Sequence, residues 1–192
     1  MAKYGSDKVA FLLIDGYSVL GSVTDLKEGI EAVTEETTPL GASWVTHEAV
    51  GLKQATLEQS GFYDDAVNGV HLALVGANGT SRVVNYGVEG NTLGSAVVCW
   101  RGVMQANYQR IVSRGALHKA NATYKVNGTV EEGVILTPLA AVTTDGDSES
   151  TSHDNAAASI AGASFYLQVS ALDLDGLAGA VVKVYDSANN VD

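Results

Sequence analysis

Short apolar runs separated by glycine-containing turns follow one another along most of the chain. The first run, "VAFLLID" at residues 9–15, predicts a strand that ends at the Asp15-Gly16 turn, with "YSVLG" as its partner. Beyond residue 80 come the runs "RVVNYGV", "SAVVCWRGV", "MQANYQRIV", "ALHKANATYKV" and "GVILTPLAAV". The segments "EGNTLG", "SRG" and "NGTVEE" between them are typical of hairpin turns. With 21 glycines and only two prolines in 192 residues, the pattern predicts a mainly β fold.

Residues 26–44, "LKEGIEAVTEETTPLGASW", interrupt this pattern because they are polar and threonine-rich but have no apolar face. The segment carries four glutamates, Glu28, Glu31, Glu35 and Glu36. Such a composition fits an extended arm or long hairpin that is buried only by a neighbour. It fits an irregular loop equally well, so both interpretations stay open.

Residues 50–61, "VGLKQATLEQSG", predict a strand with two rather polar faces. Alternate residues of a strand point to opposite faces. One face carries Leu52, Gln54, Thr56, Glu58 and Ser60, and the other carries Lys53, Ala55, Leu57, Gln59 and Gly61. This arrangement is typical of a sheet that is wetted on one side, as in the wall of a pore, or of an ordinary edge strand.

The next segment, "FYDDAVNGVHLALVG", predicts a short helix rather than a carboxylate pair. Asp64 or Asp65 is a good N-cap, and acidic side chains suit the positive end of a helix. The expected buried face holds Ala66, Val70, Ala73 and Leu74, and Gly76 is a plausible stop. Adjacent carboxylates point in different directions, whereas an acid–base pair must face one substrate.

Residues 143–155, "TTDGDSESTSHDN", contain no apolar residue and predict a flexible linker. We therefore expect a β domain at residues 1–142 and the start of a C-terminal β domain at residues 156–192. The strand-like runs of this last part are "SFYLQVSALDLDG" and "AVVKVYDSANN". Because 37 residues are too few for a separate core, we expect the chain to be a truncated form of a longer protein.

The formal net charge of −11 is unevenly distributed. Residues 1–81 carry four basic and eleven acidic side chains, residues 82–125 carry six and one, and residues 126–192 carry one and ten. Blocks of opposite sign let copies of a chain present complementary faces to one another, although an ordinary solvated surface explains them equally well. The overall acidity argues against tight, static binding to nucleic acid.

The single cysteine, Cys99, lies in the apolar run "AVVCW" and is expected to be a buried free thiol. The sequence has no apolar run near the ~18 residues that span a bilayer. The N-terminal "MAKYGSDK" has no pattern of a signal peptide. These features indicate synthesis in a reducing cytoplasm and no membrane partner.

The sequence holds no pattern that favours an enzyme. The histidines His47, His71, His118 and His153 lack the spacing of metal ligands. Ser, His and Asp coincide in "STSHDN", but a catalytic triad needs a rigid scaffold rather than a linker. "GVEGNTLG" is glycine-rich but lacks the lysine of a phosphate-binding loop. We therefore expect no catalytic residue, no metal site and no cofactor.

Several phrases together carry a family resemblance. They are "LIDGY", then "PLGASWVTHEAVGLKQATLEQSGFYDD", then "GVEGNTLG", and finally "YQRIVSRGALHKANATYKVNGTVEEGVILTPL". Over roughly residues 8–142 the chain resembles the tail tube (major tail) proteins of long-tailed bacteriophages. The resemblance implies a β-sandwich or barrel-like subunit with one short flanking helix and a long extended arm. It also implies hexameric rings that stack into a tube through which DNA leaves the capsid.

The resemblance further implies where this chain would make its contacts. The arm would reach a neighbouring ring through Glu28, Glu31, Glu35, Glu36, Thr37 and Trp44. An acidic lumen would repel DNA phosphates, and Gln54 and Glu58 are the candidates to line it. Arg110, Arg114, Lys119 and Lys125 are candidate inter-subunit basic residues. The partners would be further copies, other phage tail proteins and passing double-stranded DNA, in a virion tail made in the cytoplasm of a host bacterium.

A second hypothesis is a virion decoration or carbohydrate-binding β module. It rests on the β-rich sequence and on three aromatic residues that such a module would expose, Tyr63, Trp100 and Tyr166.

Overall fold

The computed structural model describes residues 5–66, 69–139 and 164–169. Within these residues the chain is mainly β, as the apolar pattern predicts. Its strands are β1 (Leu12–Ile14), β2 (Tyr17–Ser18), β3 (Val23–Glu36), β4 (His47–Phe62), β5 (Ser81–Gly87), β6 (Ala96–Ile111) and β7 (Lys119–Val134). The helical elements are α1 (Val70–Leu74) and two 3-10 turns, Ser6–Lys8 and Leu20–Ser22. None of the helices in the described part of the chain has the length and apolar character to cross a membrane.

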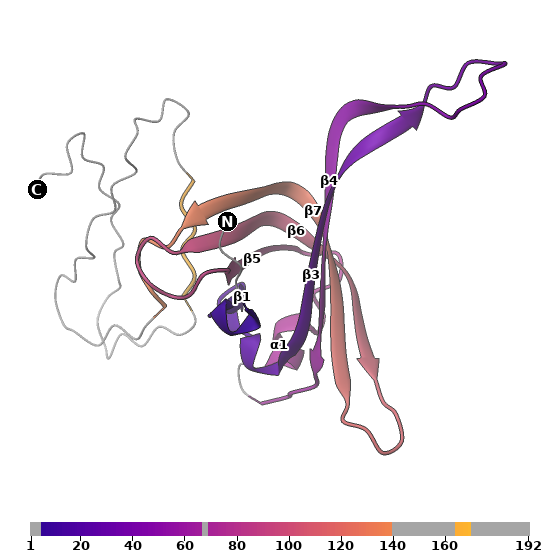
Figure 1. The fold of residues 1–192 in the computed structure, drawn as a ribbon. Coiled ribbons are helices and arrows are strands. Elements are labelled where there is room, and N and C mark those ends of the chain that lie inside the picture. The colour runs from indigo at the N-terminus through magenta and orange to yellow at the C-terminus, as the bar shows by residue number, and fades with distance from the viewer. Residues whose placement is uncertain (1–4, 67–68, 140–163, 170–192) are drawn as a thin grey trace, which may run out of the picture.

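The seven strands form one antiparallel sheet in the order β2-β1-β5-β6-β7-β4-β3. The sheet curls strongly, as Figure 1 shows. The Tyr86 hydroxyl on β5 donates a hydrogen bond to the Glu28 carboxylate on β3, although three strands separate β5 from β3. A flat sheet would hold these strands about 19 Å apart, because neighbouring strands lie ~4.8 Å apart. One continuous sheet therefore curls until β3 approaches β5, and the chain becomes sandwich-like without a second sheet.

The concave face of the curled sheet encloses the main core. Trp100, Tyr124, Leu57 and Val103 are fully buried there, and α1 covers one end of it (Figure 1). The face of α1 that packs against the sheet holds Val70, Ala73 and Leu74. Burial is the main cause that raises the pKa of Tyr124, whose hydroxyl donates to Gln59 Oε1 at 3.2 Å.

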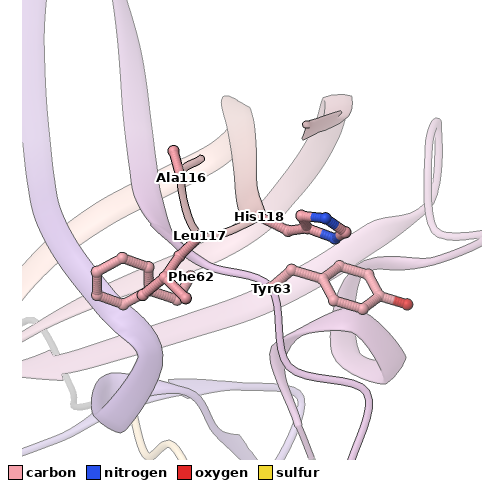
Figure 2. A pocket seen from close by; sticks show the side chains of 5 residues that line it. All are labelled: Phe62, Tyr63, Ala116, Leu117 and His118. Carbon is pink, nitrogen blue, oxygen red and sulfur yellow. The ribbon is translucent and has the colours of Figure 1, made fainter. Parts of the chain in front are cut away.

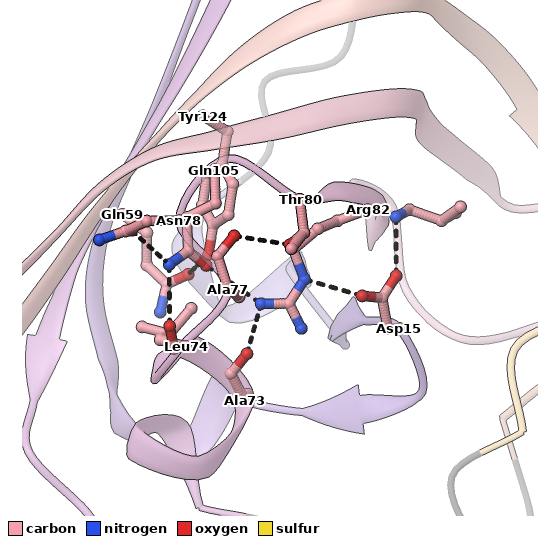
Figure 3. Close-up of polar contacts among 11 residues, drawn as sticks. Asp15, Gln59, Ala73, Leu74, Ala77, Asn78, Thr80, Arg82, Gln105 and Tyr124 are labelled. Carbon is pink, nitrogen blue, oxygen red and sulfur yellow. Dashed lines mark hydrogen bonds and ion pairs between the residues drawn. The ribbon is translucent and has the colours of Figure 1, made fainter.

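The buried side chain of Arg82 on β5 links three further segments: the β1–β2 turn, α1 and β6 (Figure 3). The Arg82 side chain, 6% exposed, donates from Nε to Asp15 Oδ2 at 2.7 Å and from Nη1 to Gln105 Oε1 at 3.0 Å. Its Nη1 also donates to the backbone carbonyl of Ala73. Gln105 Nε2 in turn donates to the Leu74 carbonyl at 2.8 Å. The network thus satisfies carbonyls at the end of α1, which a helix leaves without internal partners, and fixes α1 to β5, β6 and the β1–β2 turn.

Several sequence predictions are confirmed. The Asp15-Gly16 turn joins β1 to β2 with φ values of 47° and 87°. The polar segment at residues 26–44 is a hairpin arm rather than an irregular loop, because its residues belong to β3 and to the β3–β4 turn. "EGNTLG" and "SRG" lie in the β5–β6 and β6–β7 connections.

The predicted turn at "NGTVEE" is wrong, because β7 runs straight through it. The sheet has an irregularity here, between the Arg101↔Thr129 and Val103↔Val126 pairs. A Cβ at Gly128 would collide with the carbonyl oxygen of Arg101. The glycine therefore permits a close backbone approach inside a long strand instead of a chain reversal. The runs "SAVVCWRGV" and "MQANYQRIV", which follow each other without a turn signal, contribute to one long strand, β6.

The helix is present, but its predicted start is wrong. It begins at Val70, with Gly69 as the N-cap and no side-chain capping bond. Asp64 instead accepts a hydrogen bond from the Ala66 N–H at 3.0 Å, and its carbonyl accepts one from the His71 N–H at 2.9 Å. Aspartate side chains often bond the backbone two residues ahead in this way, so Asp64 shapes the chain after β4.

The predicted domain boundaries remain a prediction. Most of residues 140–192 lies outside the described residues, including the whole predicted linker at 143–155. Of the predicted C-terminal part, residues 164–169 are described and have no regular secondary structure.

Gly61→Ala should destabilise the fold, because a Cβ at this position would collide with the backbone carbonyl of Ser22. We expect a loss of about 1–3 kcal/mol in the free energy of unfolding, as for other overpacked sites. Urea denaturation measures it. Gly29→Ala in the neighbouring strand is the matched control, since a Cβ there meets nothing within 4 Å. Equal midpoints for the two variants would contradict the close packing of β4 against residue 22.

Arg82→Met should lower the free energy of unfolding by about 1–3 kcal/mol, because it leaves the buried Gln105 Oε1 and the Ala73 carbonyl without this donor. Thermal and urea unfolding measure the loss. Arg101→Met is the control, because Arg101 is more than half exposed and its Nη2 lies 3.9 Å from Glu131 Oε1. Such exposed pairs contribute little to stability. A similar loss in both variants would refute the structural role of the buried network.

Candidate functional site

Four neighbouring strands present a polar surface on the side of the sheet opposite the main core. On β4 the buried residues Ala55, Leu57, Gln59 and Gly61 alternate with exposed or half-exposed ones. The cross-strand register places Lys27, Glu58 and Thr123 in one row and Asp25, Ser60 and Asn121 in the next. The polar face, as we name this surface, consists of Asp25, Lys27, Glu31, Gln54, Thr56, Glu58, Ser60, Asn107, Gln109, Lys119, Asn121, Thr123 and Lys125.

Both candidate lumen residues, Gln54 and Glu58, lie on the polar face. Gln54 Nε2 donates to Glu31 Oε2 at 3.1 Å, and the Lys27 ammonium lies 3.6 Å from Glu58 Oε2. The polar face as defined carries three acidic residues, on β3 and β4, and three basic ones, on β3 and β7. Its formal charge is therefore balanced. The acidic excess that the sequence resemblance implied for a lumen is not found on this face.

The polar face is bounded by two unpaired strand edges. Within the described residues, β3 pairs only with β4, and residues 107–111 of β6 pair only with β7. β5 pairs with β6 only as far as Met104. Unpaired edges present rows of free N–H and C=O groups, which template pairing with another chain. The four strands β3, β4, β7 and β6 thus form a ribbon that can be extended on both sides.

The arm predicted from the sequence projects from one end of this ribbon (Figure 1). Glu28, at its base, points to the side opposite the polar face and accepts the Tyr86 hydrogen bond. Glu31 lies on the polar face, whereas Glu35 and Glu36 lie near the tip, opposite Glu48 and His47. Thr37 closes the tip by donating its N–H to the Thr46 carbonyl at 2.9 Å. Trp44 is 84% exposed there.

The β6–β7 hairpin forms the opposite end of the ribbon, and most candidate basic residues lie on it. Arg110 ends β6 beside Ile111, Arg114 lies in the turn, and Lys119 begins β7. Lys125 lies farther along β7, opposite Thr56 on the polar face. The structure therefore groups three of the four basic residues and places the fourth apart from them.

A groove at this hairpin end was not predicted from the sequence. It has a volume of about 550 Å³ and is lined by Phe62, Tyr63, Ala116, Leu117 and His118 (Figure 2). The Tyr63 ring packs against His71, with ring centroids 4.9 Å apart, and His71 Nδ1 lies 2.8 Å from the Tyr108 hydroxyl. The groove joins residues 62–63 to residues 116–118, which are far apart in the sequence, so no local pattern signals it.

The convex surface of β6 and β7 at the other end of the sheet is covered by residues 164–169. Tyr166 packs on a small cluster that contains Val97, Cys99 and Ile135, and its hydroxyl donates to Glu131 Oε2 at 2.6 Å. That hydrogen bond is the main cause that lowers the pKa of Glu131. Burial, and then Glu131, raises the pKa of Tyr166 to about 12. Burial is also the main cause that raises the pKa of Cys99 to about 11.

The rival binding-module hypothesis loses one of its three aromatic residues. Trp100 is fully buried in the main core, so the expectation that it is exposed is wrong. Tyr63 and Tyr166 are half-buried and packed against neighbours. In the described part of the chain, no three His, Cys, Asp or Glu residues come close enough to hold a metal ion.

Comparison with known proteins supports the fold. No family model matches the sequence, and no curated protein matches it. A chain in the virion of a native gene transfer agent (GTA) particle has a TM-score of 0.51 and 12% identity, over 69% of this chain and 100% of that chain. The two chains share a fold. A chain in the tail of an empty GTA particle with C6 symmetry has a TM-score of 0.48 and 11% identity, over 67% and 98%. That second superposition is too loose to carry an argument.

The Cys99 thiol should react slowly, because its raised pKa leaves roughly one thiolate in a thousand at pH 8. We expect labelling with a disulfide reagent to be at least about 100-fold slower in the native chain than in guanidinium. Tyr166→Ala should speed the native reaction several-fold by uncovering the cluster. Native labelling as fast as in denaturant would show that residues 164–169 do not cover Cys99.

Proposed function

We propose that this chain is the structural subunit of a phage-like tail tube, which assembles into rings that stack around a channel for DNA. The observation that carries the proposal is the four-stranded ribbon with one polar face and two unpaired edges. Its other face is already buried against the chain's own core. Only the polar face is therefore free to line a water-filled space.

The strand directions allow the ribbon to close into a ring. β3 is antiparallel to β4, β4 to β7 and β7 to β6, so β3 and β6 run in opposite directions. The free edge of β6 in one copy can therefore continue an antiparallel sheet with β3 of the next. Such a head-to-tail contact between copies closes into a ring when the rotation fits, and closure removes every exposed edge.

The size of such a ring suits the proposed channel. Six copies, the number that the resemblance to tail tube proteins implies, would contribute 24 strands. With strands ~4.8 Å apart and tilted by ~40°, this barrel would be about 50 Å across between backbones. After the inward side chains are allowed for, duplex DNA would still pass.

The side chains of the polar face suit the passage of DNA rather than its tight binding. Tight binding of DNA requires clustered Lys and Arg that neutralise many phosphates. Here acidic and basic residues alternate across the strands, and Glu58 lies beside Lys27 and in the row next to Lys125. The fold shared with a chain of a gene transfer agent virion also supports a role in a particle. The partners would then be further copies and other tail proteins, in a virion tail made in the bacterial cytoplasm.

Assembly should protect the two edges from hydrogen exchange. We expect electron micrographs of the concentrated chain to show rings or tubes with an open centre. On assembly, amides in residues 24–31 and 106–111 should exchange at least about tenfold more slowly, because edge pairing gives them acceptors. Amides of β1 and β5 serve as the internal control.

Isolated globules at every concentration would contradict the proposal and favour the binding-module hypothesis. If rings form but the amides of residues 24–31 and 106–111 exchange as fast as before assembly, the two edges do not close the ring.

A further inference from the structure

The arm tip and the hairpin end lie at opposite ends of the ribbon. We call residues 37–46, with the β3 and β4 residues next to them, the arm tip. The hairpin end comprises residues 110–119 with Phe62 and Tyr63. β4 runs from the tip at His47 to Phe62, which pairs with Lys119 at the hairpin end. A strand of this length spans about 50 Å, so the two ends of one copy cannot touch (Figure 1).

The arm tip is an ordered apolar projection. Leu40, Trp44 and Val45 are all exposed, and Trp44 is the largest side chain there. Backbone bonds from Thr37 to Thr46 and from Ala42 to Pro39 hold the loop, and the Thr46 N–H donates to Thr38 Oγ1 at 3.0 Å. A loop that is already ordered loses little entropy when it binds.

The hairpin end carries an apolar groove, whereas the arm tip carries an apolar projection. The groove lined by Phe62, Tyr63 and Leu117 is largely apolar, and Phe62 and Leu117 are 40% and 71% exposed. A second hollow next to it is lined by Ile111, Ala116 and Leu117, among others. Exposed apolar surface around a groove, rimmed by polar residues, is characteristic of an interaction site.

The charges of the two ends are opposite. Residues 28–52 hold five glutamates and no lysine or arginine, whereas residues 102–130 hold four basic residues and no acidic one. Within the described residues, no ion pair engages Glu35, Glu36, Arg110 or Arg114. Glu35 lies directly opposite Glu48 across the strand pair, and like charges in that position are destabilising. A cation from another molecule would relieve this repulsion.

We propose that the arm tip of one copy docks into the groove at the hairpin end of a second copy in the next ring. Trp44 enters the groove between Phe62 and Leu117, and Glu35 and Glu36 meet Arg110 and Arg114. Because the two surfaces lie at opposite ends, the contact repeats along the strand direction and stacks rings without limit. This inference rests on the proposed function, and it identifies the surface that receives the arm.

Charge-swap variants of the full chain test the contact. Glu35→Lys/Glu36→Lys should leave rings intact but raise the concentration needed for tubes at least about tenfold, because like charges then face each other. Arg110→Glu/Arg114→Glu should do the same, because a side-chain change at Arg110 leaves the backbone groups of the β6 edge able to pair. The four changes combined should restore tubes. Trp44→Ala should also raise the threshold at least about tenfold, since buried tryptophans dominate many interfaces. Pelleting assays and electron microscopy count tubes and rings separately.

The control is Asp7→Lys/Glu132→Lys, which makes the same change in net charge as Glu35→Lys/Glu36→Lys but at exposed sites outside both ends. It should assemble as the unmodified chain does. Tubes that form normally in the arm and hairpin variants would overturn this inference and leave the ring proposal standing. Failure of the combined variant to restore tubes would overturn the pairing of these charges. An unmodified chain that forms no rings at all would overturn the proposed function and this inference with it.

Discussion

The register between β4 and β7 is the constraint on which the rest of the structure depends. Seven residue pairs, from Thr56↔Lys125 to Phe62↔Lys119, join the β3–β4 hairpin to the β6–β7 hairpin. Because side chains alternate, a slip by one residue would move either Leu57 or Tyr124 from the core to the solvent and bring Glu58 or Lys125 inside. The register therefore defines the buried and the polar face in a single step. It also sets the arm and the basic hairpin at opposite ends.

Two directions of growth follow from this geometry. The free edges of β3 and β6 lie on the sides of the ribbon, so pairing between them extends the sheet laterally. The arm tip and the hairpin end lie along the strands, so contact between them extends the assembly axially. A subunit with both kinds of contact would build a tube, and most of the polar face would stay free to line its channel. The buried network around Arg82 holds α1 and the β1–β2 turn at the margin of the core.

Much of the fold was predictable from local pattern, whereas the surfaces made by distant residues were not. The alternation of Gln54, Thr56 and Glu58 with Ala55 and Leu57 correctly separated the two faces of β4. However, the sequence did not show that the Ala55–Leu57 side is core, because Gln59 on that side is polar. Gln59 is nevertheless buried there, and its Oε1 accepts a hydrogen bond from the buried Tyr124 hydroxyl.

The errors share a physical cause. Asn127-Gly128 matches a turn signal, but neighbouring strand pairs continue the ladder past it, and the glycine serves a close backbone approach. The binding-module hypothesis expected Trp100 on the surface, yet the curl of the sheet encloses it in the core. The groove at Phe62 and Leu117 and the balanced charge of the polar face depend on cross-strand neighbours. Only the tertiary structure specifies those neighbours.

A three-dimensional reconstruction of the assembled chain by electron cryo-microscopy tests the central claim most directly. The account predicts that β6 of each copy pairs antiparallel with β3 of the next, and that Lys27, Glu58 and Thr123 point into the channel. A reconstruction in which the polar face lies on the outside, or in which copies meet without edge pairing, would contradict it.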